Sequence, residues 1–115
     1  EFHGKPLATA GLGQSAPLAV NLSQDQAWML YGFQRDGVTY LQVNDLTGNV
    51  QLIIGNAGGT YFVLPAGSNG AKVSLPEQRI GVPAGAVRSQ IYQSSDFSLV
   101  RYRSGDEVVW SVEAP

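Results

Sequence analysis

The chain has 115 residues, of which 14% are charged, with a formal net charge of -2 and no cysteine. A chain of this length forms one domain and buries about two-thirds of the surface that its unfolded form exposes. The absence of cysteine excludes disulfides and thiolate metal sites. The sequence pI of about 5.1 argues against a nucleic-acid binder, which normally carries a basic stripe. No apolar run approaches the roughly 20 residues of a membrane-spanning helix.

The N-terminal part of the chain differs from the rest. Residues 1–17 contain Gly, Pro and Ala with little periodicity and are expected to form a flexible arm. Residues 18–115 are expected to form a single all-β domain, because turn signals recur about every 8–12 residues. Short strands are expected at 18–22 and 72–75. The start at Glu1 fits a processed form, an excised domain or a chain that carries added residues. The low charged fraction leads us to expect a periplasmic or secreted protein.

Three consecutive β-hairpins are expected between residues 27 and 64. Asp36-Gly37 is a strong signal for a two-residue turn, because both residues tolerate positive φ, and it pairs 27–35 with 38–45. Thr47-Gly48 is expected to form the second two-residue turn. The pairs that follow are Leu30 with Val43, Gly32 with Leu41, Phe33 with Tyr40, Val43 with Leu52, and Leu41 with Ile54. Both registers place the same residues on one inner face: Leu30, Leu41, Val43, Val50, Leu52 and Ile54.

The outer face of these hairpins is predicted to be aromatic. The third connection, 55–59, is interpreted as a looser loop that leaves Phe62 and Leu64 on the inner face. The outer stripe then consists of Tyr31, Phe33, Tyr40 and Tyr61, with Ile53 and Val63. Since antiparallel sheets usually leave their outer face to water, this stripe needs a cover. Residues 86–113 are the favoured cover, and the alternative is that the stripe is itself a binding face.

Two more hairpins are expected in the second half of the chain, joining 86–93 to 97–104 and 97–104 to 107–113. A loop at 94–96 would pair Ile91 with Leu99 and leave Tyr92 on the opposite face. Gly105-Asp106 would pair Arg101 with Trp110 and Leu99 with Val112. Two antiparallel meanders with about eight strands in total predict an antiparallel β-sandwich or a small barrel.

Residues suited to catalysis are scarce. The only histidine, His3, lies in the expected arm, so the usual base for a serine or threonine nucleophile is missing from the domain. Aspartates at turns are explained by side-chain hydrogen bonds to nearby backbone N–H groups. A carboxylate-dependent hydrolase is the least favoured alternative, and it would need Glu77 or Glu113 to face a second acid across a cleft. We therefore expect no enzyme, no metal site and no cofactor.

Two surfaces are candidate binding sites. The first is the stripe of Tyr31, Phe33, Tyr40 and Tyr61. The alternative is that these side chains belong to the hydrophobic core and are covered by a second sheet. The second is Arg101, Arg103 and Trp110, because arginine and tryptophan are enriched at interface hot spots. Its alternative role is packing, with arginine stems covering one edge of the core.

The expected function is binding of a protein partner, as an inhibitor, an immunity protein or an assembly accessory. A carbohydrate-binding module that stacks sugars on the tyrosine face is the alternative. Assembly with a second copy of the chain is a further possibility for the same surfaces, and no nucleic-acid partner is expected.

Overall fold

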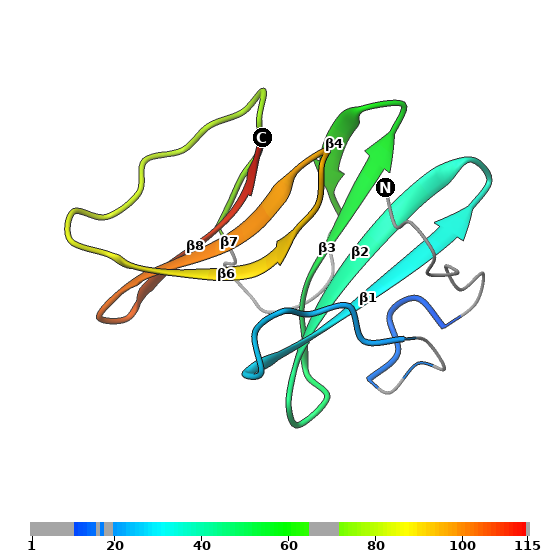
Figure 1. Cartoon of the computed structure of the whole chain (residues 1–115), viewed down its shortest axis with the longest axis horizontal. Helices are drawn as coiled ribbons and strands as arrows, with labels where there is room; N and C mark the ends of the chain where they lie inside the picture. The colour runs from blue at the N-terminus through cyan, green and yellow to red at the C-terminus, as the bar shows by residue number, and fades with distance from the viewer. Residues whose placement is uncertain (1–10, 16, 18–19, 65–71, 115) are drawn as a thin grey trace.

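The computed structural model describes residues 11–15, 17, 20–64 and 72–114. These residues form two four-stranded sheets, with strand orders β1-β2-β3-β4 and β5-β8-β7-β6 (Figure 1). The strands are β1 (Trp28–Arg35), β2 (Val38–Asp45), β3 (Val50–Ala57), β4 (Thr60–Val63), β5 (Lys72–Ser74), β6 (Val87–Gln93), β7 (Ser98–Ser104) and β8 (Glu107–Glu113). The predicted all-β sandwich is confirmed. The short strand β5 adds a parallel pair with β8 to the antiparallel meander.

The hydrophobic core lies between the two sheets. The first sheet contributes Leu30, Leu41, Val43, Leu52 and Ile54, all at most 2% exposed. The second sheet contributes Ile91, Leu99, Trp110 and Val112 to the same cluster. Full burial of one such side chain contributes about 1.5–3 kcal/mol, so this shared core is what holds the two sheets together.

The first hairpin has the predicted register. Leu30 pairs with Val43, Gly32 with Leu41 and Phe33 with Tyr40. Asp36 and Gly37 have φ values of 53° and 79°, as a type I′ turn requires. The hairpin of β7 and β8 is also confirmed, with Arg101 opposite Trp110 and Leu99 opposite Val112.

The second turn is wider than predicted. Val43 pairs with Leu52 as expected, but a register shift places Asn44 opposite Val50, so the two-residue turn at Thr47-Gly48 is wrong. The Asp45 carboxylate explains the wider turn, because it accepts hydrogen bonds from the backbone N–H groups of Thr47 and Asn49, both at 2.9 Å. The bulge moves Val50 away from its predicted place among the inner-face residues.

The turn at Asp45 should make the stability of the protein depend on pH in the acidic range. Hydrogen bonds from Thr47 and Asn49 lower the pKa of Asp45 from 3.8 to about 2. A lowered folded-state pKa means that the ionised carboxylate stabilises the fold above pH 4 and that this contribution disappears as the pH falls toward 2. We expect Asp45→Asn to lower the melting temperature at pH 7 and the difference from the parent protein to narrow between about pH 4 and pH 2. Thermal unfolding followed by circular dichroism between about pH 2 and pH 7 measures the two melting temperatures. A difference between them that does not change with pH would contradict the prediction.

The third hairpin contradicts the predicted register. Gly58 and Gly59 form a two-residue turn with φ values of 60° and 92°. Ile54 therefore pairs with Val63, and Gly55 pairs with Phe62. Because directly opposed residues share a face, Tyr61 and Val63 lie on the inner side and Phe62 lies on the outer side. The prediction was wrong because it treated 55–59 as a loose loop, although Gly-Gly is itself a tight-turn signal.

The hairpin of β6 and β7 also differs from the prediction. A register shift between Gln90 and Tyr92 makes Ile91 a bulge, so Leu99 pairs with Tyr92 instead of Ile91. Both Ile91 and Tyr92 lie in the core cluster as a result. The connection between β6 and β7 covers residues 94–97, one more than predicted, and within it the Ser94 N–H donates to the Phe97 carbonyl.

The two sides of the sandwich differ. On one side the segment before β1 links the sheets: the Leu22 N–H donates to Leu30 on β1, and the Gln24 N–H donates to Ile91 on β6. The Gln24 side chain adds two further hydrogen bonds to the backbone of Gln93. On the other side the terminal strands are β4 and β5, and among the described residues no hydrogen bond joins them. Among the described residues, hydrogen bonds therefore join the two sheets at β1 and β6 (the closed side) but not between β4 and β5, which we call the open side.

Candidate functional site

The predicted aromatic stripe is largely buried. Tyr31 is 6% exposed and Phe33 is fully buried, while Tyr40 is half-buried. Part of the cover comes from the N-terminal segment of residues 11–15 and 17, where Gly11 lies next to the Phe33 ring and Pro17 is buried. The prediction that residues 86–113 cover this face is wrong, because that part of the chain pairs within the second sheet and packs on the inner face of the first.

Two buried amide side chains hold the N-terminal segment in place. Gln42 accepts a hydrogen bond from the Gly13 N–H at 2.6 Å and donates to the Gln14 carbonyl at 2.8 Å. Asn44 donates to the Ser15 carbonyl at 3.1 Å. Both amides are fully buried and are also bonded to each other. Since buried polar groups must be paired, this network fixes residues 13–15 against β2.

Tyr61 does not belong to the stripe. It lies on the inner side with its ring 5.9 Å from that of Phe97, and its pKa is raised by burial and by the negative charge of Asp96. Phe62 takes the outer position instead, with its ring 6.4 Å from Tyr40 in an edge-to-face arrangement. The aromatic rings left half-buried on the outer face are therefore those of Tyr40 and Phe62.

The second predicted surface brings only two of its three residues together. Arg101 and Trp110 meet, with the guanidinium carbon 5.4 Å from the centroid of the Trp110 ring. The guanidinium lies still closer to Trp28, at 4.8 Å, and the two tryptophan rings are nearly perpendicular. Arg103 is exposed and its Nε donates to the Gly105 carbonyl, so it does not join the cluster. Trp28 was missed, although it shares the inner face with Leu30 by the alternation of β1.

The tryptophan and arginine cluster is mainly a packing arrangement. Trp110 is only 3% exposed, and Trp28 packs against the core. Burial and the charge of Arg103 lower the pKa of Arg101, whereas Asp25 acts in the opposite direction. Among the described residues, the buried Nε of Arg101 has no hydrogen-bond partner. The cation–π contacts with the two rings offset this cost, which makes the cluster the cap of one end of the core.

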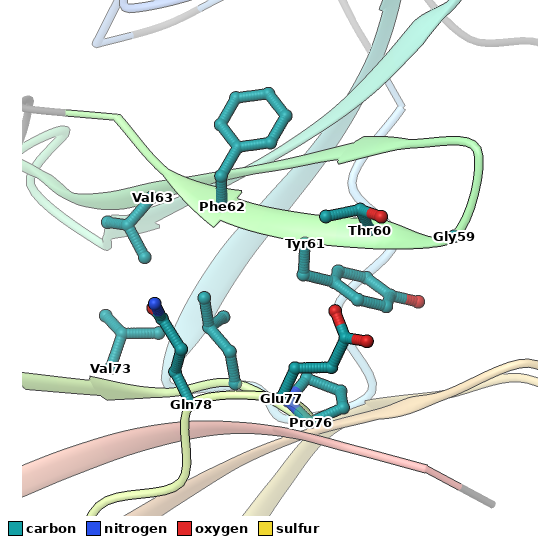
Figure 2. Close-up of a pocket in the computed structure, with 10 residues that line it drawn as sticks. Gly59, Thr60, Tyr61, Phe62, Val63, Val73, Pro76, Glu77 and Gln78 are labelled. Carbon is teal, nitrogen blue, oxygen red and sulfur yellow. The ribbon is translucent and has the colours of Figure 1, made fainter.

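A pocket of about 530 Å³ opens between the two terminal strands β4 and β5 (Figure 2). Its lining consists of Gly59, Thr60, Tyr61, Phe62, Val63, Val73, Leu75, Pro76, Glu77 and Gln78. Tyr61 and Val63 point into it, and Phe62 points away from it. Val73 and Leu75 line it from the side of the second sheet. The volume lies in the range of ordinary ligand pockets, and the walls combine apolar side chains with polar groups, of which Glu77 is the charged one.

The pocket could not be found from the predicted registers. With Tyr61 and Val63 assigned to the outer face, the inner side of β4 would have carried Phe62 and Leu64. The actual register turns the smaller Val63 and the hydroxyl-bearing Tyr61 inward, next to the turn that follows β5. The signal that could have revealed it was Gly58-Gly59, which fixes the face of every residue in β4.

The carboxylate that was considered for catalysis at the end of β8 is already bonded. Glu113 accepts hydrogen bonds from the hydroxyls of Tyr102, at 2.7 Å, and Ser111, at 3.2 Å. Its oxygens also lie 3.7 Å from Arg79 and 3.8 Å from Arg88. These four groups give Glu113 a structural role on the outer face of the second sheet. His3 lies outside the described residues.

Within the described parts of the chain, no three histidine, aspartate or glutamate side chains come together as metal ligands would. The same residues contain no helix that could cross a membrane. No protein family, curated protein or solved structure matches the chain.

Proposed function

We propose that this protein is a non-catalytic binding domain that recognises a protein partner through the open side of the sandwich between β4 and β5. The pocket lined by Tyr61, Val63 and Val73 carries this proposal. It is a concave site with a mixed apolar and polar lining that two sheet edges border, and interfaces typically anchor apolar or aromatic side chains in pockets. The inhibitor, immunity and assembly-accessory types of binding protein all fit this description.

Two observations favour this side over the surfaces predicted first. Tyr31 and Phe33 are buried and Tyr61 lies on the inner side, so a flat aromatic platform for sugar rings retains only Tyr40 of its four predicted members. Trp110 is buried in the core, so the arginine and tryptophan cluster offers a partner little more than Arg101 and Arg103. An extracytoplasmic location is part of the proposal, and it is supported by the low charged fraction of the sequence.

Val63→Arg tests the site. Val63 is 40% exposed and points into the pocket, so an arginine there fills the pocket without entering the core. The matched control is Val87→Arg, because Val87 is a 68% exposed valine on β6, the terminal strand at the closed side. We expect a partner captured from an extract of the source organism, and identified by mass spectrometry, to bind the parent chain and the Val87→Arg variant but not the Val63→Arg variant. Equal capture by both variants would overturn the assignment of the site.

A further inference from the structure

The backbone of β4 presents unused hydrogen-bonding groups beside the pocket. The Leu64 N–H donates to the Ile53 carbonyl at 3.0 Å, which makes Leu64 and Ile53 a hydrogen-bonded pair. In an antiparallel ladder such pairs alternate, so Phe62 bonds Gly55 on β3, while the peptide groups of Tyr61 and Val63 face away from β3. Among the described residues nothing pairs with them, because β4 is the last strand of its sheet. A row of this kind is a template for another strand.

The terminal strand of the other sheet is better protected. The Leu75 and Gln78 backbones donate hydrogen bonds to each other, and the Ile80 N–H donates to the Ser74 hydroxyl. The chain after β5 therefore folds back on the end of that strand. Of the two edges that border the pocket, β4 is the one without such a return of the chain among the described residues.

A strand added to β4 would place side chains in the pocket. Side chains alternate along a strand, so every second residue of the added strand would lie on the same side as Tyr61 and Val63. These positions face the apolar walls formed by Val73 and Leu75. The added strand would thus gain backbone hydrogen bonds from β4 and side-chain burial from the pocket, which is how strand addition combines affinity with specificity.

The charge of the pocket indicates the chemistry of the occupant. Glu77 is exposed, lines the pocket and, among the described residues, forms no ion pair or hydrogen bond. Its carboxylate points toward Tyr61, where Asp96 adds negative potential (Figure 2). No lysine or arginine is among the described residues that line the pocket. A cationic side chain is therefore favoured there, and a second copy of this chain, with its own Glu77 and a net charge of -2, is disfavoured.

We infer that β4 binds an extended, basic segment of the partner protein as an additional antiparallel or parallel strand. Aliphatic side chains of that segment enter the pocket, and a lysine or arginine lies next to Glu77. This inference rests on the proposed function, since it specifies the part of the partner that the open side recognises.

The experiment uses short phage-displayed peptides in which threonine alternates with randomised residues, selected on the whole chain. We expect the enriched peptides to carry aliphatic residues and one lysine or arginine at the randomised positions. Binding of a synthetic peptide from this set should fall at least about tenfold for Val63→Pro, which removes an N–H that faces the added strand while the β3 hydrogen bonds remain. The matched control is Val87→Pro, at the first residue of the terminal strand β6, and it should bind like the parent.

Two further measurements keep the inference open to refutation if Val63→Pro does not fold. Glu77→Lys, on an exposed side chain, should reverse the preference toward acidic peptides. Hydrogen exchange of the Tyr61 and Val63 amides should slow at least about tenfold on peptide binding, because these amides become hydrogen-bonded. Lack of enrichment, enrichment without charge preference, or unchanged exchange of the two amides would overturn strand addition. If the partner nevertheless depends on Val63 in the capture experiment, the binding site stands and only the strand model fails.

Discussion

Replacing Gln42 with leucine is expected to lower the free energy of unfolding by about 3 kcal/mol, because a buried donor and a buried acceptor each lose their partner. Leucine has a similar volume but cannot accept from the Gly13 N–H or donate to the Gln14 carbonyl. Asn44 also loses the hydrogen bond that it receives from Gln42. The N-terminal segment should then separate from β2 and uncover Phe33 and Tyr31. Urea unfolding measures the loss of stability, and hydrogen exchange of the Gly13 amide reports release of the segment.

A matched control for Gln42→Leu is Gln34→Leu. Gln34 is an exposed residue of β1 in the same sheet, and no hydrogen bond of its side chain to another described residue is present. This substitution should change the stability by less than about 0.5 kcal/mol, as surface substitutions usually do. If Gln42→Leu had an equally small effect, the segment would not depend on the amide network, and the burial of the aromatic stripe would need another cause.

Gly55→Ala is expected to lower the free energy of unfolding by about 2 kcal/mol, since overpacking at a tight contact costs about 1–3 kcal/mol. A Cβ on Gly55 would lie 2.2 Å from the nearest atom of the Phe62 ring. The ring would have to leave both Gly55 and Tyr40, against which it now packs. Thermal unfolding of the single variant gives the size of the effect.

The double variant Gly55→Ala with Phe62→Ala tests the register of the third hairpin directly. With the ring removed, alanine at position 55 should be neutral or should stabilise β3 by about 0.5–1 kcal/mol, because glycine is unfavourable within a strand. The sign of the Gly55→Ala effect therefore reverses between the two backgrounds. If it were the same in both, Phe62 would not lie over Gly55, and the register with Phe62 on the inner face would regain support.

Much of the fold could be predicted because local turn chemistry sets the pairing of neighbouring strands. Asp36-Gly37 and Gly105-Asp106 each leave one choice of register, and both predictions are confirmed. The inner-face residues of β1 and β2 followed from the first of these registers by alternation, and those of β3, apart from Val50, followed from its predicted pairs with Leu41 and Val43. The errors arose where a bulge or a tighter turn shifted the strand register by one residue. This happened at Asp45–Asn49, Gly58-Gly59 and Ile91. A one-residue change exchanges the two faces of a strand, so Tyr61 and Phe62 were assigned to the wrong faces.

The candidate site depended on contacts that no local pattern encodes. The cover of Tyr31 and Phe33 comes from residues that precede β1, and it is held by hydrogen bonds from Gln42 and Asn44 across about 30 residues of sequence. The pocket between β4 and β5 lies on the side where, among the described residues, no hydrogen bond joins the two sheets, whereas the segment around Gln24 links them on the other side. By itself the sequence determined the strands, most of their registers and the inner faces, because turns and alternation act between neighbours in the chain. Only the tertiary structure decided which outer surface is covered and which edge stays open, because those outcomes depend on packing between segments that are distant in sequence.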